Sequence, residues 1–227
     1  MLEHLLPDAK KPTRVVVIGA GGFVGGAIAR ELARQGVPVH GLTRKEVDLV
    51  ADGAAARLGS YLKAEDSVVF VSALAPSRTT AMLVANLRMA EAVGQALAAQ
   101  PVAHLVYVSS DAVYADDANP VTERSRCQPS SLHGMMHAAR ELMLGNDVKA
   151  PLAILRPSLL YGARDPHNGY GPNRFRRLAE KGEAITLFGE GEEQRDHIFI
   201  DDVAALAALV LHHRSRGVLN IATGVST

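Results

Sequence analysis

The stretch RVVVIGAGGFVGGAIARELARQG, residues 14–36, decides the fold. It opens with a run of Val and Ile, which predicts a strand over residues 14–20 that is buried on both faces. Gly19, Gly22 and Gly25 follow, at the point where a helical pattern begins. Such glycines permit a tight turn and let backbone N–H groups and a helix N-terminus approach an anion. We therefore predict that this turn holds the pyrophosphate of a dinucleotide; the alternative is a tight turn that binds nothing.

The same alternation of apolar runs and helical patterns continues along most of the chain. The predicted strands are residues 14–20, 37–43, 67–73, 103–110 and 150–158, and the predicted helices are residues 23–35, 52–62, 80–100 and 130–145. Continuous Val/Ile/Leu strands separated by helices indicate a parallel sheet covered on both faces. The expected fold class is therefore α/β, a doubly wound parallel sheet of Rossmann type, with ligands bound at the carboxyl ends of the strands.

The character of the sequence changes after Tyr161. A loop rich in Gly, Pro and Asn comes first. The patterns then predict a helix at 173–181, strands at 184–189 and 195–200, a helix at 201–213 and a last strand at 218–221. We predict a dinucleotide-binding domain over residues 1–163. Residues 164–227 then form a small, incomplete C-terminal substrate lobe, with late elements that return to the main domain.

Composition excludes several classes of function. The 24 Lys and Arg residues are balanced by 24 Asp and Glu, and the basic residues form no long run. This argues against nucleic acid or an anionic membrane as a partner. No apolar run reaches the roughly 18 residues of a membrane span. Cys127 is the only cysteine, so a reducing compartment fits. We expect a cytoplasmic protein whose partner is a small molecule.

The glycine spacing, with Phe23 after the second glycine, resembles the extended short-chain dehydrogenase/reductase family, also called the NAD-dependent epimerase/dehydratase family. Four further segments resemble that family in the same order. They are YVSSDAVYADDANPVTE (107–123), ILRPSLLYGARD (154–165), LFGEGEEQRDHIFIDDVA (187–204) and VLNIATG (218–224). The resemblance covers nearly the whole chain and implies a nicotinamide dinucleotide cofactor.

The end of the second predicted strand bears on the choice of dinucleotide. Enzymes that select NAD place an Asp or Glu there to bond the ribose 2′-hydroxyl. Here Thr43 holds that place, followed by Arg44 and Lys45, and no carboxylate is expected to repel a 2′-phosphate. A guanidinium can bind such a phosphate through two parallel hydrogen bonds, so we predict NADP as the preferred cofactor and NAD as the alternative. The other interpretation is that Arg44 is a solvated loop residue.

The segment GLTRKEVDL also resembles nucleotide-sugar reductases. That resemblance implies that Asp48 and Leu49 lie near the adenine. Ser72, Ala73 and Leu74 would then line the ribose and pyrophosphate. The predicted cofactor-binding residues are Gly19, Gly22, Phe23, Gly25, Thr43, Arg44, Asp48, Leu49, Ser72, Ala73 and Leu74.

The family's catalytic positions are altered in this chain. By resemblance, Ser110 bonds the reacting oxygen, and Asp111 follows it. The family's acid/base Tyr and the Lys four residues later are replaced by His133 and His137. His133 can move a proton, because the reference pKa of His, about 6.5, is near neutral. His137 is neutral at pH 7 unless a carboxylate or the cofactor's phosphates raise its pKa, and a cationic His137 would depress the pKa of His133.

Two other interpretations of these residues are weaker. A dehydratase needs an Asp-Glu pair, and here Asp111 is followed by Ala112. His133 and His137, at a spacing of four on a helix, suit zinc, but the Glu of H-E-x-x-H and a third ligand are missing. We therefore expect no metal site.

On the substrate side, the resemblance implies that Arg195 contacts a substrate diphosphate, with Asn173 beside it; an ion pair to a loop carboxylate is the alternative for Arg195. Arg156 is expected to brace a turn. We predict an NAD(P)-dependent epimerase or reductase acting on a nucleotide sugar or a related carbonyl compound. The alternative is a catalytically impaired dinucleotide-binding protein that senses cofactor or serves a partner. The apolar face of residues 82–97 also permits a homodimer.

Overall fold

The computed structural model describes residues 1–115, 120–166, 168 and 171–226. A six-stranded parallel sheet forms its centre, in the order β2-β1-β3-β4-β5-β8. The strands are β1 (Val15–Ile18), β2 (Val39–Leu42), β3 (Ser67–Phe70), β4 (His104–Val108), β5 (Leu152–Pro157) and β8 (Gly217–Ile221). All five pairings between neighbours are parallel, which confirms the predicted doubly wound sheet.

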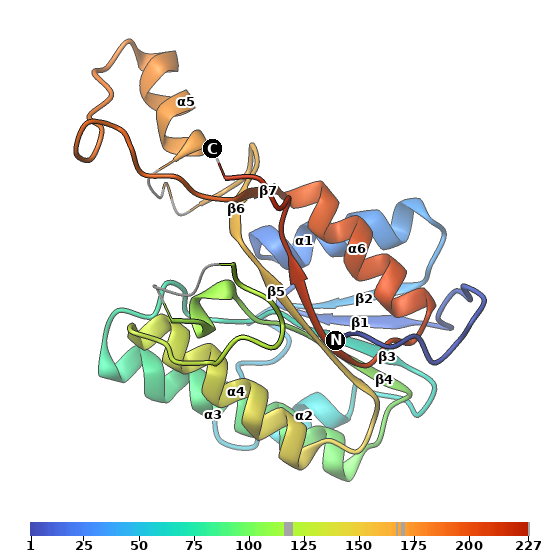
Figure 1. Cartoon of the computed structure of the whole chain (residues 1–227). Helices are drawn as coiled ribbons and strands as arrows, with labels where there is room; N and C mark the ends of the chain where they lie inside the picture. Colours follow the sequence, from blue (N-terminus) through green and yellow to red (C-terminus); the bar gives the residue numbers. More distant parts are fainter. Residues whose placement is uncertain (116–119, 167, 169–170, 227) are drawn as a thin grey trace.

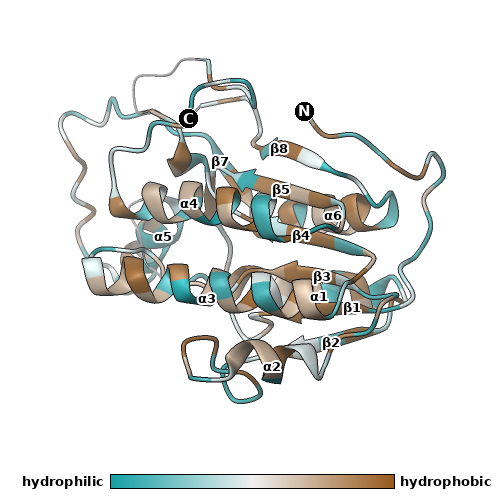
Figure 2. Cartoon of the chain, turned by 90° about the horizontal axis from the view of Figure 1, so that it is seen from below, coloured by the Kyte–Doolittle hydropathy of each residue, from teal (hydrophilic) through white to brown (hydrophobic). Residues whose placement is uncertain are grey.

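Helices cover both faces of this sheet (Figure 1). On one face lie α1 (Phe23–Arg34) and α6 (Ile200–His212). On the other lie α2 (Ala54–Gly59), α3 (Thr80–Ala99) and α4 (Leu132–Asp147). Two apolar clusters fill the spaces between sheet and helices, and the inner strands β1, β3 and β4 are mainly hydrophobic (Figure 2). No helix in the described part of the chain is long and apolar enough to cross a membrane.

A small lobe extends beyond the carboxyl ends of the main strands (Figure 1). It contains a two-stranded parallel sheet of β6 (Leu159–Tyr161) and β7 (His197–Phe199), and the helix α5 (Pro172–Lys181). The chain then returns to the main sheet through α6 and β8. A domain boundary after residue 163 stays a prediction.

One predicted element is wrong. Residues 184–189 form no strand, and the whole segment 183–195 is exposed or nearly so. Ile185, Leu187 and Phe188 point their apolar side chains outward, with exposed fractions of 41–59%. An alternating apolar pattern becomes a strand only where a sheet edge supplies hydrogen-bond partners. In the described residues of the small lobe, β6 and β7 pair with each other, and residues 184–189 join neither of them.

The turn between β1 and α1 requires glycine at two positions. Gly19 has a φ of +102°, and a side chain there would lie 2.8 Å from the Ser72 backbone nitrogen. A Cβ on Gly25 would lie 2.2 Å from the Gly19 carbonyl oxygen. Both contacts are with backbone, which cannot move aside without displacing β3 or the turn itself. The predicted tight strand-to-helix turn is therefore confirmed.

Replacing Gly25 by Ala should lower the free energy of unfolding by about 2 kcal/mol or more, because overpacking against fixed backbone is costly. Urea unfolding followed by circular dichroism measures this. Gly59→Ala is the matched control: Gly59 ends a helix with open space where its Cβ would be, so it should remain within about 1 kcal/mol of the parent. Equal stabilities of the two variants would contradict the crowded turn.

His104 opens β4 and is fully buried. Its Nε2 donates to the Ser215 carbonyl at 2.6 Å. Burial lowers the pKa of His104 to about 4, the hydrogen bond to Ser215 opposes this, and the charge of Arg214 adds to it. His104 is therefore neutral in the folded protein at pH 7.

Since the unfolded chain binds this proton more readily, acidification from pH 6.5 to pH 4 should remove up to about 3 kcal/mol of stability through His104. His104→Gln keeps a donor but does not titrate. Its unfolding free energy should fall less steeply with pH than that of the parent in urea titrations between pH 4.5 and 7. Parallel pH profiles would show that His104 is not the source.

Candidate functional site

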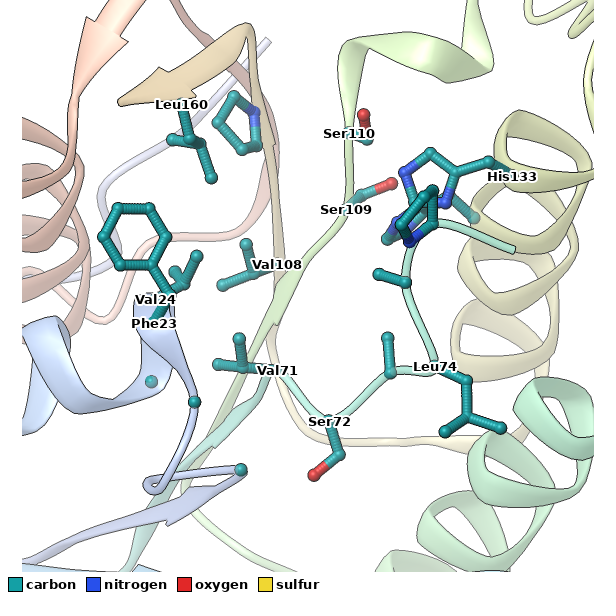
Figure 3. Close-up of a pocket in the computed structure, with 18 of the residues that line it drawn as sticks. Phe23, Val24, Val71, Ser72, Leu74, Val108, Ser109, Ser110, His133 and Leu160 are labelled. Atoms are coloured by element: carbon teal, nitrogen blue, oxygen red, sulfur yellow. The ribbon is translucent and has the colours of Figure 1, made fainter. Parts of the chain in front are cut away.

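A cavity of about 740 Å³ lies at the carboxyl ends of the central strands. Val71 and Ser72 follow β3, Ser109 and Ser110 follow β4, and Ser158 follows β5; all five line the cavity. Figure 3 shows Phe23 and Leu160 on one side of it, with Ser110 and His133 on the other. The cavity therefore opens where a doubly wound sheet binds ligands.

Most of the residues predicted to bind the cofactor line this cavity. They are Gly19, Gly22, Phe23, Gly25, Arg44, Asp48, Leu49, Ser72, Ala73 and Leu74. The N-cap of α1 is Gly22, which supplies no capping side chain, and the first turn of the helix holds no acidic residue. Backbone N–H groups at this end of α1 are therefore left for an anion, which fits a pyrophosphate.

Thr43 is the predicted cofactor residue that lies outside the cavity lining. Its backbone N–H and its hydroxyl both donate to the Glu46 carboxylate, at 2.8 and 2.6 Å. Thr43 therefore organises the turn after β2.

Arg44 and Asp48 differ from the sequence-based expectation. The turn after β2 brings the Asp48 carboxylate to 2.9 Å from the Arg44 guanidinium, whose side chain is otherwise 79% exposed. This ion pair lowers the pKa of Asp48, chiefly through the hydrogen bond from Arg44. The expectation that no carboxylate stands at this place was wrong, because the turn folds Asp48 back beside Arg44. Arg44 lines the cavity, and its high exposure also agrees with the alternative of a solvated loop residue, so its role stays a prediction.

The loop after β3 is held by two residues that the sequence-based prediction missed, Asn86 and Arg140. The Leu74 N–H donates to the Asn86 side chain at 2.9 Å, and the Asn86 amide donates to the Leu74 carbonyl at 3.0 Å. The Arg140 guanidinium donates to the Ser72 carbonyl at 2.9 Å. Both are polar residues at positions where the helical spacing of α3 and α4 predicts buried apolar side chains. A polar residue at such a position could have indicated a buried hydrogen-bonding role.

Ser110 and Asp111 lie together at the end of β4. The Ser110 hydroxyl donates to Asp111 at 3.1 Å and accepts from the Ala112 N–H at 3.2 Å, which caps the short 3₁₀ helix Asp111–Val113. Asp111 is an exposed residue that lines the cavity, where protein surrounds much of its carboxyl group. The resulting desolvation raises the pKa of Asp111, against the hydrogen bond from Ser110.

His133 and His137 both line the cavity, from one face of α4. Their ring centroids are 4.8 Å apart and the rings are perpendicular. The Ser77 N–H donates to Nδ1 of His133 at 3.4 Å. Gly134 lets α4 pack directly on the segment that carries Ser110. A Cβ at this position would lie 1.9 Å from the Ala112 carbonyl oxygen.

His137 is buried, and its Nδ1 lies 2.8 Å from the Tyr107 hydroxyl. Burial lowers the pKa of His137 well below the ordinary value, and the neighbouring His133 and Arg140 act in the same direction. These effects favour the neutral form of His137 over the cation that would depress the pKa of His133.

A buried ion pair joins α4 to β5. Arg156 donates to both Glu141 oxygens, at 2.9 and 2.5 Å, and to the Tyr114 hydroxyl at 2.7 Å. Ser109 donates to the same carboxylate at 2.6 Å. Arg156 was expected to brace a turn; instead it ties β5 to α4 through Glu141 and to the Tyr114 hydroxyl. The same network fixes the side chain of Ser109.

Of the two predicted substrate residues, Asn173 lines the cavity and Arg195 does not. Asn173 lines the cavity and is buried, but its side chain bonds the Gly162 N–H at 3.2 Å and Asp165 at 2.9 Å. Arg195 lies outside the lining and forms an ion pair with Glu193, the alternative considered from the sequence. His197 on β7 lines the cavity and was missed. Among the described residues, no group of three metal-ligating side chains is arranged to hold an ion.

Known proteins share this architecture. UDP-N-acetylglucosamine 4-epimerase from Bacillus cereus is 26% identical, with a TM-score of 0.82 over 94% of this chain and 76% of that one. The enzyme of the same name from Methanobrevibacter ruminantium, solved with UDP-N-acetylmuramic acid, is 25% identical, with a TM-score of 0.80 over 96% and 78%. MoeE5, solved with UDP-glucose and NAD, is 25% identical, with a TM-score of 0.74 over 94% and 77%.

These neighbours lend no support to the alternative of a catalytically impaired protein.

The model of the NAD-dependent epimerase/dehydratase family matches residues 15–222, from the first strand to the segment after β8. With the glycine turn, the parallel sheet and the cavity at its carboxyl edge, this match shows that the chain belongs to the NAD-dependent epimerase/dehydratase family.

Proposed function

We propose that this protein binds a nicotinamide dinucleotide in its cavity and acts as an epimerase or reductase on a nucleotide sugar or a related carbonyl compound. One observation carries the proposal: a single cavity brings the glycine turn of α1 together with Ser110 and His133. A phosphate-binding turn and a proton-transfer pair are thus available to the same ligand.

The residues present fit a dinucleotide. Uncapped N–H groups at the start of α1 would hold the pyrophosphate, with Ser72, Ala73 and Leu74 alongside. Asp48 and Leu49 would lie at the adenine end. When bound, the nicotinamide supplies or accepts the hydride of the reaction.

Ser110 would hold the reacting oxygen, since its hydroxyl stands at the cavity edge of β4. His133 would give a proton to that oxygen when a carbonyl is reduced, and remove one when an alcohol is oxidised. Asp111, whose raised pKa favours its protonated form, would lie beside the same oxygen. Asn173 and Arg195 stay predictions for the substrate side, with Asn173 better placed.

Assembly and location also stay predictions. Val84, Met135 and Leu142 on α3 and α4 expose apolar side chains, which supports a homodimer through these helices. The composition and the single cysteine are the support for a cytoplasmic location.

The Arg44–Asp48 pair makes the choice between NAD and NADP testable. Asp48→Asn removes the carboxylate that occupies Arg44, so NADP should bind several-fold more tightly while NAD changes little. Arg44→Ala should weaken NADP about tenfold and leave NAD within about threefold. Calorimetry with both dinucleotides measures these affinities. An Arg44→Ala variant that loses both dinucleotides equally would refute a role in selection.

His133→Ala should reduce turnover by at least about a hundredfold, the usual contribution of a positioned acid/base group, while dinucleotide affinity changes by less than about threefold. With a panel of nucleotide sugars, oxidation of the reduced dinucleotide measures reductase turnover, and NMR of the epimeric sugar product measures epimerase turnover. Asn146→Ala, an exposed polar residue near the end of the same helix, is the control. Undiminished turnover in His133→Ala would show that His133 is not the acid/base group. If the parent protein turns over no member of the panel, the proposed activity on nucleotide sugars is wrong.

A further inference from the structure

The buried Tyr107 hydroxyl has two polar neighbours beside the cavity, Arg140 and His137. Arg140 and Tyr107 are fully buried, and His137 lines the cavity with an exposed fraction of 6%. The Tyr107 hydroxyl lies 2.8 Å from Nδ1 of His137. A neutral imidazole carries a single N–H, so the direction of this one hydrogen bond decides what His137 offers to the cavity.

The position of Arg140 sets that direction. Its guanidinium donates to the Asn86 carbonyl at 2.9 Å, to the Ser72 carbonyl at 2.9 Å and to the Asn86 side chain at 3.0 Å. It also lies close enough to the Tyr107 hydroxyl that its charge and hydrogen bonding oppose the rise in pKa that burial causes there. A guanidinium can only donate, so it faces the lone pairs of the phenol oxygen. Tyr107 is fully buried, and in the described part of the chain Nδ1 of His137 is the one hydrogen-bond partner of its hydroxyl besides the guanidinium. A buried phenol proton needs an acceptor, so the proton of Tyr107 goes to Nδ1 of His137.

We propose that His137 is held as the neutral imidazole with its proton on Nε2, and that this N–H donates a hydrogen bond to a hydroxyl group of the ligand in the cavity. Tyr107 and Arg140 are the positioning residues that select this form. The identity of that hydroxyl as one on a dinucleotide ribose rests on the proposed function. The protonation form itself does not, because it follows from contacts within the chain.

The groups that face His137 all favour its neutral form. His133 approaches edge to face at a centroid distance of 4.8 Å, and Arg140 brings a fixed positive charge from the same helix. The nearest carboxylate on this helix, Glu141, is engaged by Arg156 and Ser109. Burial disfavours the cation further, which agrees with the direction of the pKa shift of His137.

Nitrogen-15 NMR of the unliganded full chain tests the form of His137 without any activity. Imidazole nitrogen shifts separate the two neutral forms from the cation. The expected result is a proton on Nε2 of His137 from pH 6 to pH 8, with no titration in that range. A proton on Nδ1, or a transition to the cation, would overturn the proposal.

Two variants of His137 test the donor role. Gln places its amide N–H₂ near the position of Nε2, whereas Asn places it near Nδ1. The affinity of His137→Gln for NAD and NADH should stay within about threefold of the parent, and His137→Asn should bind about 3- to 10-fold more weakly, the cost of one hydrogen bond. Equal weakening in both would refute the donor role. If the parent binds neither dinucleotide, the proposed function fails, and the NMR result still decides the form of His137.

Discussion

The close approach of backbone to backbone at the start of α1 is the constraint on which the site depends. Gly25 sits against the Gly19 carbonyl, and Gly19 sits against the Ser72 amide. The turn is tied to both neighbouring strands, because the Gly19 N–H donates to Leu42 at 2.8 Å and the Ser72 N–H donates to Ile18 at 3.1 Å. Since these contacts leave no room for side chains, α1 begins at the sheet edge, and its free N–H groups face the cavity.

The opposite wall of the cavity is built by α4 through buried polar contacts. Arg140 reaches the loop after β3, and Glu141 reaches the ends of β4 and β5 through Ser109 and Arg156. Buried charges are costly to desolvate and contribute little net stability compared with apolar packing. Here each of them is satisfied by a strand-end group that lines or adjoins the cavity. Their effect is to fix the geometry of Ser110, His133 and His137 relative to the sheet.

The fold could be predicted from the sequence because each buried strand reads as a short Val/Ile/Leu run, and the first of them ends in glycines with a single structural explanation. The segment 184–189 failed because a strand needs a partner edge, which local pattern does not reveal. Most of the cofactor residues could be placed by their position after β1, β2 and β3. The partners of Arg44, Thr43 and His137 could not, since each is set by a turn or a tertiary contact.

The charged groups around the cavity differ between its two ends, so each end suits a different part of a ligand. Among the described lining residues, the only Lys or Arg is Arg44, and it is paired with Asp48. The acidic side chains of Asp111 and Asp165 also line the cavity. Attraction for an anion therefore comes chiefly from backbone N–H groups at the start of α1, where the helix dipole adds to it.

The end near Ser110, with an acid of raised pKa and a neutral His137, is suited to an uncharged group such as a hydroxyl or a carbonyl. A ligand that is anionic at one end and neutral at its reacting centre satisfies both requirements, so its orientation is set by the electrostatics of the chain before any side chain takes part in chemistry.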